Sequence, residues 1–170
     1  DGTDDQVEGY QSWFATAAVP PYAGPVWYVS TSGSDSNDGS EESKFATIQK
    51  AINSANDGDT ALVAGGTYVE NLTWPLTNGI KLIGSGQETC IIDGNQQSSV
   101  IRFEEDLGGI IDTTTLVTGF TIQNGYAQEA SGWPNNTGGG IFCGVNTSPS
   151  ISNLIISGNT SSRGGGIYCG

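Results

Sequence analysis

The chain has 170 residues, which is enough for one ordinary domain with a hydrophobic core but hardly for two. Its formal net charge of -13, with only five Lys and Arg, argues against partners that need clustered cations, such as nucleic acids and anionic membrane surfaces. No stretch is as long and apolar as a membrane-spanning helix requires. The 26 Gly residues, with abundant Ser, Thr and Asn, are instead typical of short strands joined by tight turns.

Residues 1–25 show little periodicity and contain Trp13, Phe14 and several prolines. This pattern predicts an extended N-terminal arm or linker, in which Trp13 and Phe14 are candidate contacts to a partner or to the domain surface. The chain opens on acidic residues, as the mature segment of an exported protein would. We therefore expect a secreted or cell-surface protein.

Residues 26–30 read as a short strand, and a polar loop follows it. Over residues 45–56 the apolar side chains recur at spacings of three and four, which predicts a one-sided helix. Ser43 or Thr47 can cap its N-terminus, and Gly58 occupies a position where a left-handed residue is expected to end it. No other segment predicts a helix as clearly.

After Gly58 the sequence reads as short strands that fall into triplets. We place the strands at residues 60–65, 69–74 and 80–85, then 90–94, 99–103 and 119–125, then 139–143, 148–151 and 153–159, with 165–169 opening a fourth triplet. Insertions at 104–115 and 126–137 lengthen two turns. A repeated strand triplet is typical of a parallel β-solenoid, in which equivalent strands stack ~4.8 Å apart.

The heptad GGGIFCG at 138–144 recurs as GGGIYCG at 164–170. It predicts that Ile141 and Ile167 stack in the core of neighbouring coils. A coil cannot bury its apolar side alone, so the helix is expected to cover the first coil. Because no second cap follows the last strand, we expect the domain of residues 26–170 to continue beyond 170 or to dock against another chain.

The segment WYVSTSGSDSNDGSEESKFATIQKAINSANDGDTALVAGGTYVENL resembles the N-terminal part of bacterial secreted right-handed parallel β-helix proteins of the pectate-lyase-like superfamily. The stretches CIIDGNQQSSVIRF, GFTIQNG and GGGI(F/Y)C are similar to coils of large bacterial surface proteins and, distantly, to polymorphic outer-membrane adhesin repeats. Over residues 26–170, the resemblance implies an all-β fold, a right-handed parallel β-helix of about three coils with an N-terminal amphipathic helix cap. For function it is less specific, because this fold hosts lyases, hydrolases, adhesins and fibres.

The resemblance to lyases implies calcium-holding acids beside a Lys or Arg base on one outer face. The only basic residues on the predicted strands of the coils are Lys81 and Arg102, and Glu104, Glu105 and Asp106 follow Arg102. These five residues are the candidate catalytic group. A solvated charged turn explains them better, because the chain has no His as a general base and its acidic surface would repel an anionic substrate.

The loop SDSNDGSEE offers four hard oxygen ligands, Asp35, Asn37, Asp38 and Glu41, beside a glycine. Calcium prefers such ligands, and it is the one cofactor that the sequence suggests. A metal-free loop closed by Asx turns explains the same residues.

Cys143 and Cys169 occupy equivalent places in the repeated heptad, which predicts α-carbons ~4.8 Å apart, within disulfide range. A stacked pair of free thiols in the core explains these residues better, since in-register side chains give poor disulfide torsion angles. Asn124 and Asn159 each adjoin a glycine at the end of the same type of strand, and their amides are predicted to stack along the axis as a structural ladder.

The second insertion carries Tyr126 and Trp133, aromatic residues suited to sugar stacking, to subunit contact or to folding back as a lid. We favour a non-enzymatic extracellular structural or adhesive protein, a rigid spacer or a self-assembling surface filament subunit. Its expected partners are copies of itself or other surface proteins. The alternative is the N-terminal part of a secreted polysaccharide lyase, or a glycan-binding module.

Overall fold

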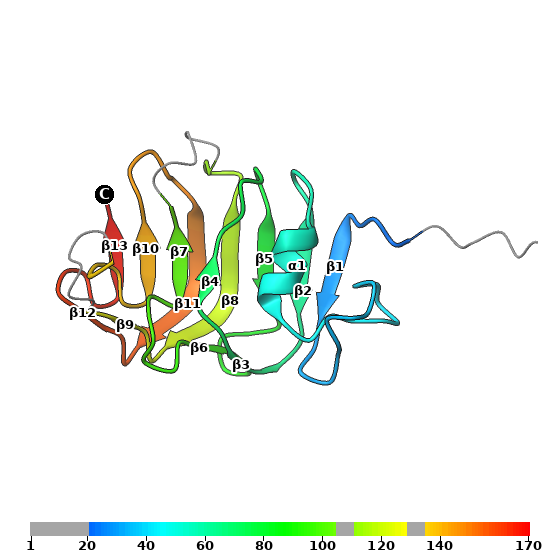
Figure 1. Ribbon diagram of the computed structural model, residues 1–170, viewed down its shortest axis with the longest axis horizontal. Helices are drawn as coiled ribbons and strands as arrows, with labels where there is room; N and C mark the ends of the chain where they lie inside the picture. The colour runs from blue at the N-terminus through cyan, green and yellow to red at the C-terminus, as the bar shows by residue number, and fades with distance from the viewer. Residues whose placement is uncertain (1–20, 105–110, 129–134) are drawn as a thin grey trace, which may run out of the picture.

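The computed structural model describes residues 21–104, 111–128 and 135–170. Its elements, in chain order, are β1 (Val26–Val29), α1 (Ile48–Ser54), β2 (Thr60–Val63), β3 (Gly66–Val69), β4 (Leu72–Thr73), β5 (Lys81–Gly84), β6 (Cys90–Asp93), β7 (Ile101–Phe103), β8 (Leu116–Gln123), β9 (Tyr126–Ala127), β10 (Ile141–Cys143), β11 (Ser150–Ser157), β12 (Thr160–Ser161) and β13 (Ile167–Cys169). The strands are arranged along the long axis of the molecule, with β1 at one end and β13 near the other (Figure 1). The helix α1 lies across the strands near β1.

The fold is a right-handed parallel β-helix. In one sheet, β1, β2, β5, β8 and β11 are successive parallel neighbours, and β3 and β6 join it through the second half of β8. A second sheet contains β4, β7, β10 and β13, and a third pairs β9 with β12. The chain makes three full turns between β2 and β11, so each strand finds its hydrogen-bond partner in the neighbouring coil.

The predicted strand positions hold better than their predicted grouping. Residues 60–63 pair with 81–84, and residues 66–69 pair with 90–93, so the predicted equivalence of 60–65 with 90–94 is wrong. The error arose because the turns differ in length. Grouping the strands by threes from residue 60 therefore assigned equivalent strands to the wrong positions in successive coils. The repeated heptad predicted the pairing of its two copies correctly, since Ile141 pairs with Ile167.

The first coil is covered by the helix and by the loop before it. The helix is shorter than predicted, Ile48–Ser54, and Thr47 is its N-cap, as expected, because its hydroxyl accepts a hydrogen bond from Lys50 N at 3.2 Å. Gly58 has a positive φ of 80°, but the helix has already ended at Ala55. The loop pairs with the free edge of β1 through Phe45 N, which donates to the Tyr28 carbonyl at 2.9 Å.

A carboxylate from the first coil holds the helix in place. Both oxygens of Glu70 accept hydrogen bonds from the helix N-terminus, from Ile48 N and Gln49 N, each at 2.9 Å. Burial raises the pKa of Glu70 despite these two bonds, which favour its charged form. The sequence pattern did not point to this contact.

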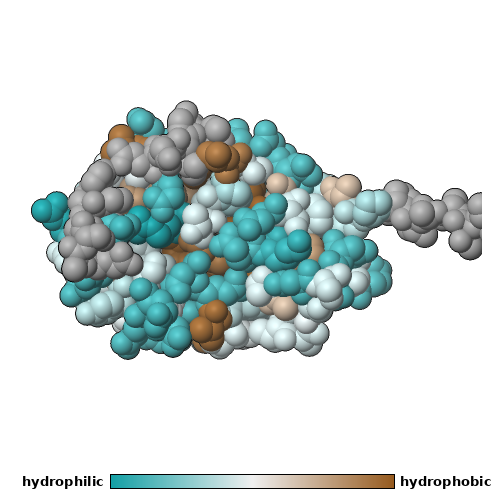
Figure 2. Space-filling model, in the orientation of Figure 1, coloured by the Kyte–Doolittle hydropathy of each residue, from teal (hydrophilic) through white to brown (hydrophobic). Residues whose placement is uncertain are grey.

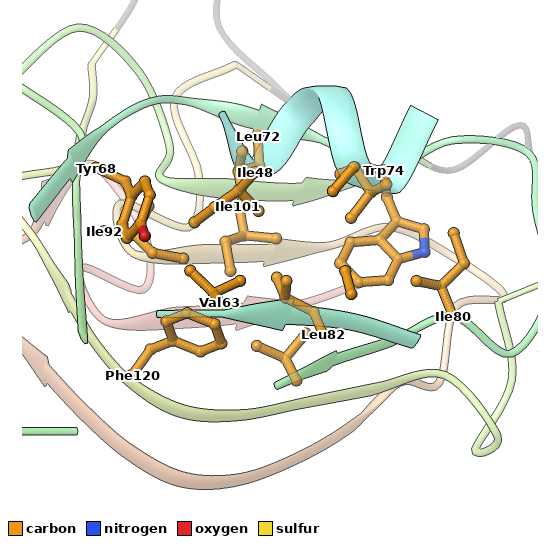
Figure 3. Packing of buried hydrophobic residues seen from close by; sticks show 14 of the residues in the cluster. Ile48, Val63, Tyr68, Leu72, Trp74, Ile80, Leu82, Ile92, Ile101 and Phe120 are labelled. Atoms are coloured by element: carbon orange, nitrogen blue, oxygen red, sulfur yellow. The ribbon is translucent and has the colours of Figure 1, made fainter. Parts of the chain in front are cut away.

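Stacked apolar side chains fill the interior of the solenoid (Figure 3). The largest fully buried side chains include Trp74, Phe103, Phe120 and Phe142. Trp74 and Phe103 contact each other with ring centroids 4.7 Å apart. Each coil closes over the apolar side chains of the one before it, which is why neighbouring coils stabilise one another.

The outside is mostly polar, and Figure 2 shows one largely hydrophilic face on which hydrophobic side chains form small, separate patches. Large hydrophobic side chains that are exposed include Val69, Leu76, Ile155 and Ile167. No helix among the described residues is long and apolar enough to cross a membrane.

Candidate functional site

The predicted calcium loop uses its polar side chains for its own hydrogen bonds. The Asp35 carboxylate accepts from Ala46 N at 2.9 Å, from Thr47 N at 3.0 Å and from the Thr47 hydroxyl at 2.7 Å. Asp38 accepts from Ser40 N at 3.0 Å, and these bonds, with little opposing burial, lower its pKa. These are the contacts of an Asx-type loop.

The other two predicted calcium ligands also make bonds within this loop. The Asn37 amide donates to the Lys44 carbonyl at 2.8 Å, and the backbone oxygen of Glu41 accepts from the Lys44 ammonium. Among the residues that the structure describes, no group of three or more His, Cys, Asp or Glu is arranged to hold a metal ion. Calcium binding at this loop stays a prediction.

The predicted catalytic group is divided between two sheets. Arg102 lies on β7, where its guanidinium pairs with Glu104 at 2.7 Å and donates to the Ser99 hydroxyl at 3.1 Å. The guanidinium also lies 4.3 Å from the ring centroid of Phe142. Lys81 lies on β5, in the other large sheet, and donates to the Gly58 carbonyl at 3.1 Å.

The remaining predicted catalytic and aromatic residues are mostly beyond what the structure describes. Glu105 and Asp106, and likewise Trp13, Phe14 and Trp133, lie outside the described residues. Tyr126 is described, on β9, with 41% of its surface exposed. Contact of Tyr126 with a sugar or a partner stays a prediction.

The two predicted asparagines lie at one corner of the solenoid and bond toward the preceding coil. Asn159 accepts from Gly125 N at 2.7 Å and donates to the Ile122 carbonyl at 3.0 Å. Asn124 donates to the Asp93 carboxylate at 2.7 Å. The amides therefore bridge neighbouring coils along the axis.

Asp93 forms the centre of a polar hollow at this corner. The hollow is about 490 Å³ and is lined by Asp93, Asn95, Gln96, Gln97 and Asn124. Burial acts to raise the pKa of Asp93, but hydrogen bonds from Gln123, Asn95 N and Asn124 outweigh it and lower the pKa. Asp93 is therefore a fixed, charged acceptor at neutral pH.

A ladder of outward-facing residues runs along the solenoid axis, and sequence reasoning missed it. Its members occupy matching register positions on five successive strands: Tyr28, Leu62, Ile83, Thr118 and Ser152. Strands ~4.8 Å apart give this ladder a length of ~19 Å. Inward-facing and outward-facing side chains alternate within each strand, and this alternation was the available signal. The predicted grouping of the strands was wrong, so the outward-facing residues of neighbouring strands were not aligned with one another.

Four residues of the ladder, Tyr28, Leu62, Ile83 and Thr118, line a groove, which we call the axial groove. It consists of two adjoining hollows of about 300 and 510 Å³ that share Ile83, Gly84 and Ser85. The first hollow is apolar and begins at Tyr28 and Lys44, and the second is more polar and contains Gln87, Thr118 and Asn153. The groove thus changes from aromatic and apolar to hydroxyl and amide side chains along its length.

Two glycines let β5 and β8 approach each other closely beneath the groove. A β-carbon on Gly84 would lie 2.3 Å from the Gly119 carbonyl oxygen, and one on Gly119 would lie 2.4 Å from the Gly84 oxygen. Neither position therefore accepts a side chain without a shift of the backbone. Both glycines line the second hollow of the groove.

The apolar end of the groove carries a defined hydrogen-bond donor. Partial burial, and then the carboxylates of Glu41 and Glu42, raise the pKa of the Tyr28 hydroxyl above its ordinary value. The hydroxyl is therefore protonated at neutral pH. Lys44 lies over the Tyr28 ring, with its ammonium 5.8 Å from the centroid. This end of the groove therefore combines an aromatic ring, a hydroxyl group and a cation.

The side chains of the axial groove are mostly uncharged. Among the described residues that line it, Lys44 is basic and none is a carboxylate. It offers an aromatic ring, aliphatic side chains, hydroxyls and amides. These are the groups that contact the faces and hydroxyls of sugars.

Residues 31–168 match the model of the family described as "Protein of unknown function (DUF1565)". The uncharacterized protein YwoF of Bacillus subtilis (strain 168) is 33% identical over 114 residues, which are 64% of this chain and 24% of YwoF. The chain therefore spans about a quarter of the length of that relative.

Solved structures with a similar fold include pectin methylesterases. PemA from Erwinia chrysanthemi superposes with a TM-score of 0.54 at 19% identity, over 81% of this chain and 44% of that enzyme. A pectin methylesterase in complex with hexasaccharide VII gives 0.53 at 20% identity, with the same coverage of both chains. At these identities the likeness shows the fold alone.

Proposed function

Because this chain belongs to the family described as "Protein of unknown function (DUF1565)" and has a right-handed parallel β-helix fold, we propose that it is a non-enzymatic extracellular module that binds a neutral glycan chain. The observation that carries this proposal is the axial groove, with its ladder of Tyr28, Leu62, Ile83, Thr118 and Ser152. A linear polymer that lies along the solenoid axis would contact one residue of the ladder at each coil.

The order of side chains in the groove suits the two kinds of surface that a sugar presents. Sugar rings have apolar faces that stack on aromatic and aliphatic side chains, and Tyr28, Leu62 and Ile83 form such a platform. Their hydroxyl groups exchange hydrogen bonds with amides and hydroxyls, which Gln87 and Asn153 provide at the other end. An extended sugar chain is therefore contacted along the whole groove.

Charge favours a neutral glycan over an acidic one. The chain carries a formal net charge of -13, and only Lys44 among the groove-lining residues is basic. A polyanionic sugar chain would approach against this field, whereas a neutral chain would not. Among the structural neighbours, the pectin methylesterases are named for pectin, which is neutral where its acid groups are esterified.

Binding to two forms of the same polymer tests the proposal. Highly methyl-esterified pectin and fully de-esterified polygalacturonate share a backbone and differ in charge, so affinity electrophoresis and calorimetry compare them directly. We expect the esterified form to bind more tightly at 150 mM salt, a difference that salt screening would reduce. Neutral mannan and β-glucan complete the set, since charge alone does not distinguish them from esterified pectin.

Substitutions in the groove connect any binding to this site. We expect Leu62→Lys and Tyr28→Ala to weaken binding about 10-fold or more, because each removes part of the stacking platform. Val69→Lys is the matched control, since Val69 is 63% exposed on β3 and does not line the groove. Equal loss in all three variants, tighter binding of polygalacturonate, or no binding to any of the glycans would each reject the proposal.

A structural role as a spacer or filament subunit is the second candidate. It is favoured by the apolar side chains of the last coil, where Ile155 and Ile167 are 39% and 40% exposed. The loop at Phe45 pairs with the edge of β1. Because this edge is already occupied, a second copy cannot simply extend the sheet there head to tail. Light scattering across a concentration series, with Ile167→Asp as the variant, distinguishes self-association from a monomer. The same samples, assayed for unsaturated sugar products, test the polysaccharide-lyase alternative.

A further inference from the structure

A pair of thiols joins the last two coils, and the proposed glycan binding does not use them. Cys143 on β10 and Cys169 on β13 are direct partners in the parallel register. The two strands lie side by side at the far end of the solenoid from α1 (Figure 1). Neighbouring parallel strands place paired α-carbons ~4.8 Å apart, which is inside the range of ~4.4–6.8 Å that disulfides span.

The two sulfurs face each other across this pair. The Cys143 thiol is buried, and its pKa is raised to about 12. Burial is the main cause, and the charge of Cys169 and a side-chain hydrogen bond with Cys169 add to it. Cys169 is exposed. The pair therefore combines one thiol that an oxidant can reach with a second thiol that contacts it.

The third cysteine provides a contrast. Cys90 is buried on β6, and its thiol donates to the Ala64 carbonyl at 3.4 Å. Its register partner on β3 is Gly66, and the pairing of β6 with β8 begins one position later, where Ile91 pairs with Thr121. No second cysteine faces Cys90. Oxidation should therefore join Cys143 to Cys169 and leave Cys90 as a free thiol.

We propose that Cys143 and Cys169 form a redox-sensitive disulfide that fastens β13 to β10. The Cys169 thiolate attacks a disulfide oxidant such as oxidised glutathione, forming a mixed disulfide and releasing one glutathione thiolate. Cys143 then loses its proton, and its sulfur attacks that of Cys169 and expels the second glutathione. Two protein thiols lose two electrons and two protons in total, and the oxidant disulfide becomes two thiols.

The consequence for the fold is a covalent link between successive coils. The bond closes the chain segment that contains β11 and β12, and it restricts the unfolded chain accordingly. Oxidising compartments outside the cytoplasm favour such bonds. The link would hold β13 in register with β10.

Trypsin provides a direct test, because Arg163 is the only basic residue between the two cysteines. The native protein is incubated with oxidised glutathione, alkylated, denatured and digested without reductant. We expect residues 103–163 and 164–170 to remain joined, to separate on reduction, and one alkylated thiol, that of Cys90, to remain. The melting temperature should rise on oxidation and return with reductant.

Variants provide the controls. Cys169→Ser and Cys143→Ser should each abolish the linked peptides and the shift in melting temperature, whereas Cys90→Ser should retain both. Three alkylatable thiols after oxidation, a persistent glutathione adduct at Cys169, or a dimer linked through Cys169 would each overturn the proposal. The Cys90→Ser protein keeps the measurement informative if either paired variant folds poorly, because its two remaining thiols must both disappear.

Discussion

The backbones of Gly84 and Gly119 approach so closely that a β-carbon on Gly119 would lie 2.4 Å from the Gly84 carbonyl oxygen. Gly119 also has a positive φ of 82°. We expect Gly119→Ala to lower the free energy of unfolding by roughly 2–5 kcal/mol, because the new methyl group adds overpacking to backbone strain. Urea unfolding followed by tryptophan fluorescence measures this loss.

Gly58 separates the two contributions in that prediction. Its φ is 80°, but a β-carbon there would meet nothing within 4 Å. Gly58→Ala should therefore cost only the backbone strain, about 1–2 kcal/mol. Equal losses at Gly58 and Gly119 would show that the two strands do not approach as closely as described.

Removal of the Asp35 carboxylate should loosen the loop that leads into the helix. Asp35→Ala deletes three hydrogen bonds, to Ala46 N, Thr47 N and the Thr47 hydroxyl. We expect a loss of roughly 1–2 kcal/mol in the free energy of unfolding. Thermal unfolding with and without calcium measures this loss and tests the calcium prediction at the same time.

The calcium comparison has two distinct outcomes. A hydrogen-bonded loop predicts the same stability with calcium or chelator, and the same loss for Asp35→Ala in both. Calcium binding at the loop predicts a rise in the melting temperature of the native protein that Asp35→Ala abolishes. Glu88→Ala, in an exposed turn elsewhere, controls for the change in net charge.

Asp93 should contribute stability that disappears in acid. Its folded pKa is lowered below the ordinary 3.8, so the contribution is complete above that value and is lost as the pH falls through the lowered pKa. Asp93→Asn should therefore be less stable than the native protein at pH 7, by about 0.5–1.5 kcal/mol, a modest figure because solvent screens this corner. Urea titrations between pH 7 and pH 2.5 should show the difference closing at the acid end. A difference that is constant with pH would contradict this account.

Arg102 should act in packing rather than in chemistry. Its guanidinium pairs with Glu104 at 2.7 Å and lies 4.3 Å from the Phe142 ring centroid. Arg102→Lys keeps the charge but loses the planar stacking, so we expect a loss of about 1 kcal/mol in stability with unchanged glycan binding. Arg163→Lys, at an exposed arginine, should change neither quantity. A stable Arg102→Lys protein with lost binding would instead place Arg102 in the functional site.

Much of the fold was readable from the sequence because its signals are local. Alternating apolar residues marked the strands, spacings of three and four marked the helix, and Thr47 marked its beginning. The repeated heptad also placed Cys143 opposite Cys169, because two identical segments in a solenoid occupy equivalent positions. These features depend on residues within one coil, or on exact repetition between coils.

The tertiary structure decided which strands stack, and therefore which side chains share a face. Turns of unequal length put 81–84, rather than 90–94, beside 60–63, and this register created the ladder from Tyr28 to Ser152. It also divided Lys81 from Arg102 between two sheets. Strand pairing is non-local and a shift of one strand regroups every outward side chain, so the axial groove had no signature in any single segment of the sequence.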